Sequence, residues 1–308
     1  MAIATVLCCI TANAQEVTPD GTYMYVQRDT CDLYLDLYRP TKGSETSING
    51  KNKPTIIFMF GGGFTSGERD NPRYQIWFRQ MNDLGYGVIS IDYRHGLKGT
   101  SKVGVAQVNL LDKAIHIAVE DLFSATGFII ENADQLGVEP DNLVISGSSA
   151  GAIAAMQAEY ELANRTSWAQ VLPEDFRYAG VISFAGAILS REGKVDYKSE
   201  PAPTLILHGT ADKVVPYKQI KVFNLGFFGG GKLVRRFEKF GFNYNMYHFL
   251  DKGHIIADAM RMTVDLQEVF LETNVMNKER RIIEAYVDDP NIENRGVSSR
   301  KEIYDREK

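Results

Sequence analysis

Hydrophobic positions along this chain fall into short runs separated by longer mixed stretches. Residues 55–60 (TIIFMF) and 87–91 (GVISI) are almost continuously apolar, which is typical of strands buried on both faces of a sheet. Residues 33–38 instead alternate, with three leucines on one face, as a strand with one covered face does. The same patterns predict further strands at residues 22–26, 143–146, 180–184, 204–207 and 245–250.

Helical patterns lie between these strands. We expect helices over residues 74–84 and 150–162, and a long helical stretch over 108–136 that a break near Gly127 would divide. Strands that alternate with helices predict an α/β fold, with a mostly parallel central sheet and helices on both faces. The first two strands are only a few residues apart, so we expect an antiparallel pair at one edge of the sheet.

Composition excludes several classes of protein. The 308 residues are 44% hydrophobic and 24% charged, which is enough for a large core and argues against a disordered chain, a fibre or a membrane bundle. A net charge of −5, from 34 basic and 39 acidic residues, gives no electrostatic reason to expect nucleic acid as a partner. Three cysteines are too few for a disulfide scaffold.

The two ends of the chain differ from its middle. Residues 1–14 carry no charge and end in Ala12-Asn13-Ala14, the small-x-small form of a signal-peptidase site, although a basic n-region is missing. This apolar run is too short to span a bilayer. We therefore expect a signal peptide over 1–14, a secreted or periplasmic protein, and a single domain over 15–287. Residues 288–308, with 11 charged residues of 21, are expected to form a charged C-terminal tail.

A candidate nucleophile lies between a predicted strand and a predicted helix. Residues 147–151 (GSSAG) fit the pattern G-x-S-x-G, and the strand before and the helix after them supply the context that a nucleophile elbow needs. The framing glycines select Ser149 rather than Ser148. A Ser/Gly-rich loop that matches by chance is the alternative on the motif alone.

A serine nucleophile needs a base, usually a histidine. Five histidines are present, and His254 is the candidate because it follows the last predicted strand in a loop. His248 lies inside that strand and His116 in mid-helix, so both are expected to be structural. His208 ends a strand and is expected to bond locally, while His95 follows a strand end near the expected site and is a candidate substrate contact.

The third candidate is an acid that orients the base. Asp212 follows the strand at 204–207 and lies between Ser149 and His254 in chain order, as the acid of this arrangement does. Taken alone it would be read as a helix cap or a turn residue. Asp251 is the rival, but it lies only three residues from His254.

A glycine run follows the strand at 55–60. Consecutive glycines let backbone N–H groups approach a ligand oxygen with no Cβ in the way, so we expect Gly62 and Gly63, together with the N–H of Ala150, to form an oxyanion hole. A phosphate cradle is the competing use of such a loop, but neither G-x-x-x-x-G-K-[ST] nor G-x-G-x-x-G is present here. A second run, at 229–231, is expected to be a flexible loop.

Taken together, these motifs resemble the α/β-hydrolases. More closely, the chain resembles carboxylesterases related to hormone-sensitive lipase and the feruloyl and acetyl-xylan esterases, over about residues 20–275. This resemblance implies Ser149, Asp212 and His254 as a catalytic triad, and no metal or organic cofactor. It departs from the family at Phe60, where a histidine often supports the glycine loop. The matching motifs are LDLYRP at 35–40, FGGGF at 60–64, DYR at 92–94, GSSAG at 147–151, HGTAD at 208–212 and GH at 253–254.

The resemblance implies hydrolysis of short-chain acyl or aromatic-acyl esters, either small molecules or esters linked to carbohydrate such as plant polysaccharides. A serine exopeptidase of the prolyl-oligopeptidase type shares the fold and triad, although no propeller precedes the hydrolase region. A non-catalytic hydrolase-fold binding protein is the other alternative. We expect the substrate pocket to be formed by loops at 65–73, 95–104, 187–203 and 227–239.

Overall fold

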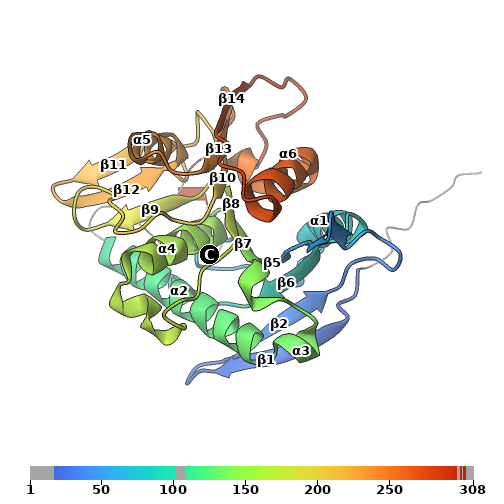
Figure 1. The fold of residues 1–308 in the computed structure, drawn as a ribbon. Coiled ribbons are helices and arrows are strands. Elements are labelled where there is room, and N and C mark those ends of the chain that lie inside the picture. The colour runs from blue at the N-terminus through green and yellow to red at the C-terminus, as the bar shows by residue number, and fades with distance from the viewer. Residues whose placement is uncertain (1–16, 101–107, 297–298, 300, 303–308) are drawn as a thin grey trace, which may run out of the picture.

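A nine-stranded sheet organises the computed structural model of the chain (Figure 1), which describes residues 17–100, 108–296, 299 and 301–302. The first two strands pair antiparallel at one edge, the second is also antiparallel to its other neighbour, and all later pairs are parallel. The predicted sheet and its antiparallel edge are thus confirmed. In spatial order the strands are β1 (Gly21–Gln27), β2 (Asp32–Tyr38), β6 (Gly87–Ile91), β5 (Thr55–Met59), β7 (Leu143–Ser148), β8 (Gly180–Phe184), β10 (Thr204–Gly209), β13 (Tyr244–Phe249) and β14 (Ile283–Val287).

Helices cover both faces of this sheet, as predicted (Figure 1). On one side lie α1 (Pro72–Asp83) and α6 (Val264–Phe270). On the other lie α2 (Val108–Glu131), α4 (Ala150–Asn164) and α5 (Gly230–Phe240). Every residue of β5, β6, β7 and β8 is therefore buried, which explains their apolar runs, because each large aliphatic side chain so buried contributes roughly 1.5–3 kcal/mol.

The long helical stretch ends differently from the prediction. Gly127 lies within α2, and the break falls at Asn132, before the short helix α3 (Ala133–Leu136). The side chain of Asn132 donates to the carbonyl of Phe128 (2.8 Å). An asparagine that bonds its own backbone competes with continuation of the helix, whereas a lone glycine costs only about 1 kcal/mol and is tolerated.

A second, three-stranded antiparallel sheet lies beside α5. It consists of β9 (Ala187–Ser190), β12 (Leu225–Gly229) and β11 (Gln219–Val222). The prediction of a flexible loop at 229–231 was wrong, because Gly229 ends β12 and the next two glycines begin α5. The buried apolar residues of α5, Leu233, Val234 and Phe237, fix this helix against the sheet and override the low helix propensity of glycine.

The remaining described elements are short. They comprise a two-stranded hairpin of β3 (Ser47–Ile48) and β4 (Lys51–Asn52), turns of 3-10 helix at Pro140–Asn142, Ser167–Val171 and His254–Met262, and a π-helical stretch at Leu271–Met276. Within the described part of the chain, no helix is both long and apolar enough to cross a membrane. The segment expected to be a signal peptide, 1–14, lies outside the described residues.

Candidate active site

Ser149 occupies a strained turn between β7 and α4. Its φ of 51° and ψ of −113° lie in a region that a non-glycine residue enters at a cost of order 1–3 kcal/mol. The turn is tight enough that a Cβ at Gly151 would come within 2.1 Å of the Met59 carbonyl oxygen. The G-x-S-x-G spacing is therefore a steric requirement of this strand–turn–helix junction.

Three side chains predicted from the sequence meet at the carboxyl end of the sheet. Ser149 Oγ lies 2.7 Å from His254 Nε2, and His254 Nδ1 lies 2.7 Å from Asp212 Oδ2. Ser149 follows β7, Asp212 follows β10 and His254 follows β13. Parallel strands place the loops at their carboxyl ends on the same side of the molecule, where α/β folds bind their ligands.

The carboxylate of Asp212 is held by four neighbours. Its Oδ1 accepts the N–H groups of Val214 (2.8 Å) and Val215 (3.0 Å), and its Oδ2 faces His254 Nδ1 and, at 3.5 Å, His208 Nε2. Burial raises the pKa of Asp212, but hydrogen bonds from His208 and His254 outweigh this effect and leave the pKa well below its ordinary value. A charged Asp212 places the proton of His254 on Nδ1, which leaves Nε2 free to accept the proton of Ser149.

The glycine run lies directly over the nucleophile. A Cβ built on Gly61 would be 3.3 Å from Ser149 Cβ, and one on Gly62, whose φ is +136°, would lie 2.0 Å from the Ser66 carbonyl oxygen. Among the described residues, neither the Gly62 nor the Gly63 N–H donates a hydrogen bond to another group. Ala150 is the first residue of α4, a position whose N–H has no partner within the helix. Gly62 and Gly63 line the same cavity as Ser149, and Ala150 directly follows it, so these three residues remain candidate oxyanion donors.

Two tyrosines support the start of the glycine run, where Phe60 stands instead of the histidine that the resemblance led us to expect. The Tyr93 hydroxyl donates to the Phe60 carbonyl (2.7 Å), and the two rings stack with centroids 4.4 Å apart. The Gly61 N–H donates to the Tyr74 hydroxyl (3.0 Å). Both contacts lie at the start of the glycine run, where the His95 ring also packs edge-on against Phe60 and Tyr93.

The competing serine and histidines have other partners. The Ser148 hydroxyl donates to the Ala257 carbonyl (2.8 Å), so it is directed away from His254. His248 bonds to Tyr217 (2.6 Å) and to Glu284, and His116 stacks on Trp168. His208 bonds locally, as expected: its Nε2 lies 3.1 Å from the Val215 carbonyl oxygen and its Nδ1 accepts the N–H of Gly230 (3.3 Å). It is also buried beside Asp212, at 3.5 Å.

A cavity of about 470 Å³ opens beside Ser149. Of the four loops expected to form it, only 65–73 contributes among the described residues. Residues 187–190 instead form β9, and 227–239 belong to β12 and α5. The remaining lining comes from segments 255–258 and 295–296, which no sequence motif indicated. The described lining consists of Gly61, Gly62, Gly63, Ser66, Gly67, Asn71, Arg73, Ser148, Ser149, His254, Ile255, Ala257, Asp258, Arg295 and Gly296.

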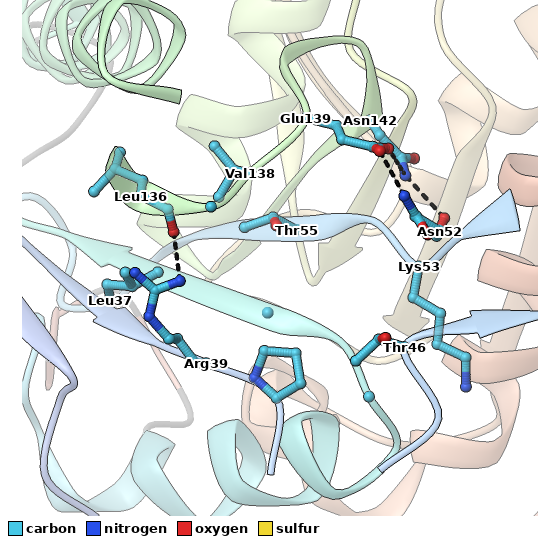
Figure 2. Close-up of a pocket in the computed structure, with 14 residues that line it drawn as sticks. Leu37, Arg39, Thr46, Asn52, Lys53, Thr55, Leu136, Val138, Glu139 and Asn142 are labelled. Carbon is cyan, nitrogen blue, oxygen red and sulfur yellow. Dashed lines mark hydrogen bonds between the residues drawn. The ribbon is translucent and has the colours of Figure 1, made fainter. Parts of the chain in front are cut away.

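A second cavity, of about 390 Å³, lies at the opposite end of the sheet, where β5 and β6 begin (Figure 2). Its charged and amide side chains bond to one another or to backbone. For example, Arg39 donates to the Leu136 carbonyl (2.7 Å), and Asn52 donates to Glu139 (2.6 Å). Because these groups already have hydrogen-bond partners within the protein, we assign them a structural role. Among the described residues, no group of three or more His, Cys, Asp or Glu side chains could hold a metal ion.

The nine-stranded sheet and the Ser149–His254–Asp212 hydrogen-bonded series define an α/β-hydrolase. A family model, BD-FAE, matches residues 35–188, half of the chain. The chain therefore belongs to the BD-FAE family of esterases, which confirms the esterase resemblance inferred from its motifs.

Curated relatives match shorter stretches. Gut esterase 1 of Caenorhabditis briggsae is 29% identical over 107 residues, which cover 35% of this chain and 18% of that protein. Lipase 2 of Moraxella sp. (strain TA144) is 26% identical over 133 residues, 42% of this chain and 27% of that protein. The matched stretches thus span less than a third of these relatives.

Solved structures match most of the chain. Esterase 2 of Thermogutta terrifontis with propionate bound superimposes with a TM-score of 0.59 at 23% identity, over 82% of this chain and 93% of that one. The same esterase phosphorylated by paraoxon gives a TM-score of 0.56 at 22% identity, over 82% and 93% of the two chains. This similarity confirms the α/β-hydrolase fold.

Proposed function

We propose that this protein is a serine carboxylesterase that hydrolyses short-chain acyl or aromatic-acyl esters through an acyl-enzyme. The observation that carries the proposal is the unbroken hydrogen-bonded series from Ser149 Oγ through His254 to Asp212, with distances of 2.7 Å at both steps. Gly62 and Gly63, whose N–H groups donate to no other described residue, line the same cavity as Ser149 and His254. A nucleophile, a base, an orienting acid and oxyanion donors are the parts that acyl transfer needs.

In the first half of the reaction, Ser149 Oγ attacks the ester carbonyl carbon and its proton passes to His254 Nε2. The carbonyl oxygen becomes an oxyanion that accepts hydrogen bonds from Gly62, Gly63 and Ala150. One such donor is worth roughly 3 kcal/mol in the transition state. The carbon–oxygen bond to the alcohol then breaks, and the alcohol leaves with the proton from His254.

In the second half, water repeats these steps on the acyl-enzyme. His254 removes a proton from the water as it attacks the acyl carbon, and the same backbone donors hold the oxyanion. The bond to Ser149 Oγ breaks, Oγ takes the proton back from His254, and the carboxylic acid departs. Asp212 stays ionised throughout and stabilises the imidazolium that forms twice in the cycle.

The substrate class and location form part of the proposal. The structures of Thermogutta terrifontis esterase 2 hold propionate and butyrate, which supports short acyl groups. The uncharged segment 1–14 with its small-x-small end supports a secreted or periplasmic protein. Esters on carbohydrates are substrates that such a protein meets outside the cell.

Hydrolysis of p-nitrophenyl acetate and butyrate by the full chain tests this proposal. Ser149→Ala should lower kcat by about 10⁴-fold or more, because the remaining groups cannot supply a nucleophile. Ser148→Ala, the neighbouring substitution, loses one buried hydrogen bond and should keep kcat within about tenfold. Each variant is first checked for a wild-type circular dichroism spectrum.

Two outcomes would contradict the proposal. Activity that survives Ser149→Ala would identify another nucleophile. A folded wild type that leaves both esters intact but cleaves aminoacyl p-nitroanilides would identify the exopeptidase alternative instead.

A further inference from the structure

The cavity beside Ser149 has a charge pattern that simple ester hydrolysis does not require. Besides His254, its charged lining among the described residues consists of Arg73, Arg295 and Asp258. Two guanidinium groups therefore share the cleft with one carboxylate. The excess of positive charge indicates a preference among substrates, since neither arginine contacts Ser149 or His254 through a hydrogen bond.

Arg73 is held in a fixed position next to the glycine run. Its guanidinium lies over the ring of Tyr74, 4.8 Å from the centroid, and its Nη2 donates to the Tyr74 hydroxyl (2.8 Å). The same hydroxyl accepts the N–H of Gly61 (3.0 Å). One tyrosine thus ties the cation to the loop that supplies the expected oxyanion donors.

The charge of Arg73 is only loosely compensated. Its acidic partner within the described part of the chain is Asp258, at 3.6 Å between Nη1 and Oδ1, and 55% of the Arg73 side chain is exposed. Arginine–carboxylate hydrogen bonds are normally 2.7–2.9 Å long. Arg69, in the loop before α1, contrasts with it: Asp36 (3.0 Å) and Asp92 (2.8 Å) both bind it, and only 20% of its side chain is exposed.

The position of Arg73 in its helix is electrostatically unfavourable. Arg73 lies in the first turn of α1, directly after Pro72, where the helix dipole disfavours a cation by a few tenths of a kcal/mol or more. Arg79, further along the same helix, is exposed and does not line the cavity. The two arginines therefore form a matched pair that differs in access to the cleft.

Arg295 reaches the cavity from the C-terminal segment. Its guanidinium pairs with Glu293, and 77% of its side chain is exposed, so solvent screens it more than Arg73. We therefore expect Arg295 to attract a negatively charged ligand less strongly than Arg73 does.

We propose that this cleft selects esters that carry a carboxylate, and that Arg73 is the specificity-determining residue. The guanidinium would exchange its long contact with Asp258 for a charge-assisted hydrogen bond to the substrate. This inference rests on the proposed esterase function. The carboxylate is the recognised chemistry, whether it belongs to the acyl group, as in a dicarboxylic half-ester, or to the alcohol, as in a uronate or hydroxybenzoate.

Two substrate pairs test the inference and separate these sources. Mono-p-nitrophenyl adipate and its methyl ester place the carboxylate on the acyl side, while meta-acetoxybenzoate and its methyl ester place it on the alcohol side. Within each pair, one methyl group removes the charge. The ratio of kcat/KM for the charged to the neutral member is measured for the full-length wild type, Arg73→Gln and Arg79→Gln.

For at least one pair the wild-type ratio should exceed about fivefold, as expected for a half-exposed ion pair. Arg73→Gln should bring this ratio to about one while kcat/KM for the neutral ester stays within about threefold. Arg79→Gln should leave the ratio unchanged. Raising the salt concentration should lower the ratio in the wild type and have little effect in Arg73→Gln.

Ratios near or below one for both pairs in the wild type would overturn the inference, and so would a raised ratio that Arg73→Gln leaves in place. Hydrolysis of the neutral esters would still support the esterase proposal in either case. Failure to hydrolyse any of the four esters would overturn both.

Discussion

At the scale of single residues, Asp212 shows how hydrogen bonds keep a buried carboxylate ionised. Its Oδ1 accepts the backbone N–H groups of Val214 and Val215, and its Oδ2 faces the imidazoles of His254, at 2.7 Å, and His208, at 3.5 Å. Because its pKa is lowered on folding, the stability that it contributes is present above the ordinary aspartate pKa and is lost as pH falls towards the folded value. The carboxylate therefore stays charged at neutral pH.

Asp212→Asn should reduce kcat by about 10⁴-fold with little change in KM, because an amide cannot hold His254 in the tautomer that accepts the Ser149 proton. Initial rates on p-nitrophenyl acetate and a thermal unfolding curve measure the two effects. Asp251→Asn, three residues before His254, is the control and should keep kcat near the wild-type value. A larger loss in Asp251→Asn than in Asp212→Asn would reassign the acid.

The residues that could be predicted from sequence are those with a steric or topological signature. Ser149 is framed by glycines that the turn requires, and Asp212 and His254 each follow a strand in the expected order. Arg73 and Arg295 carry no such signature. They are ordinary charged residues in surface segments, and only the tertiary fold brings them to one cleft.

At the scale of elements, α4 carries the nucleophile at its start and a buried acid in its interior. Glu159 Oε1 accepts the Ala202 N–H (2.8 Å), while Oε2 has no partner among the described residues. Burial raises the pKa of Glu159 to about 7, although the Ala202 hydrogen bond and nearby Arg177 oppose the shift. This helix therefore holds an ionisable group that favours its neutral form.

Glu159→Gln should change how stability depends on pH. Because the pKa of Glu159 is raised on folding, its full contribution to the stability of the wild type is present below the ordinary glutamate pKa. This contribution is lost as the pH rises towards about 7. Glutamine does not ionise, so the variant does not lose stability in this way. Its free energy of unfolding, relative to that of the wild type, should therefore rise by on the order of 1–3 kcal/mol between pH 4 and pH 8.

Thermal unfolding at several pH values measures this difference, and Glu174→Gln, on an exposed turn, is the control. A constant difference between Glu159→Gln and the wild type across this pH range would contradict the assignment.

Elements with strong patterns were predicted, and those stabilised by tertiary contacts were not. The central strands are continuously buried, so their sequences are apolar. The strand β11 is mostly exposed, and β14 is only partly buried at the edge of the sheet, so neither has a marked hydrophobic period. Pairing with β12 and β13 respectively decides their structure.

At the scale of the whole molecule, the end of the described chain returns to the active site. Asn294 Oδ1 accepts the N–H of Gly253 (2.7 Å), and its Nδ2 donates to the carbonyl of Asp251 (2.9 Å). These bonds span the turn that precedes His254. Asn294 was predicted only as part of a charged tail, yet its side chain stabilises the loop that carries the candidate base.

Asn294→Ala should lower kcat several-fold and leave the melting temperature within about 2 °C, because the two bonds are exposed and each contributes about 1 kcal/mol or less. Steady-state kinetics and calorimetry on the full chain measure both quantities. Asn291→Ala, in the same segment, is the control and should behave as the wild type. Equal effects of the two substitutions would show that Asn294 has no particular role in positioning His254.

The most direct test of the central claim is covalent labelling with paraoxon, which phosphorylates a structurally similar esterase. The account predicts release of one equivalent of p-nitrophenolate per chain, loss of esterase activity in step, and a phosphoryl label that peptide mass spectrometry assigns to Ser149. Ser149→Ala should take up no label. Labelling of a different residue, or full esterase activity in protein labelled at Ser149, would contradict the account.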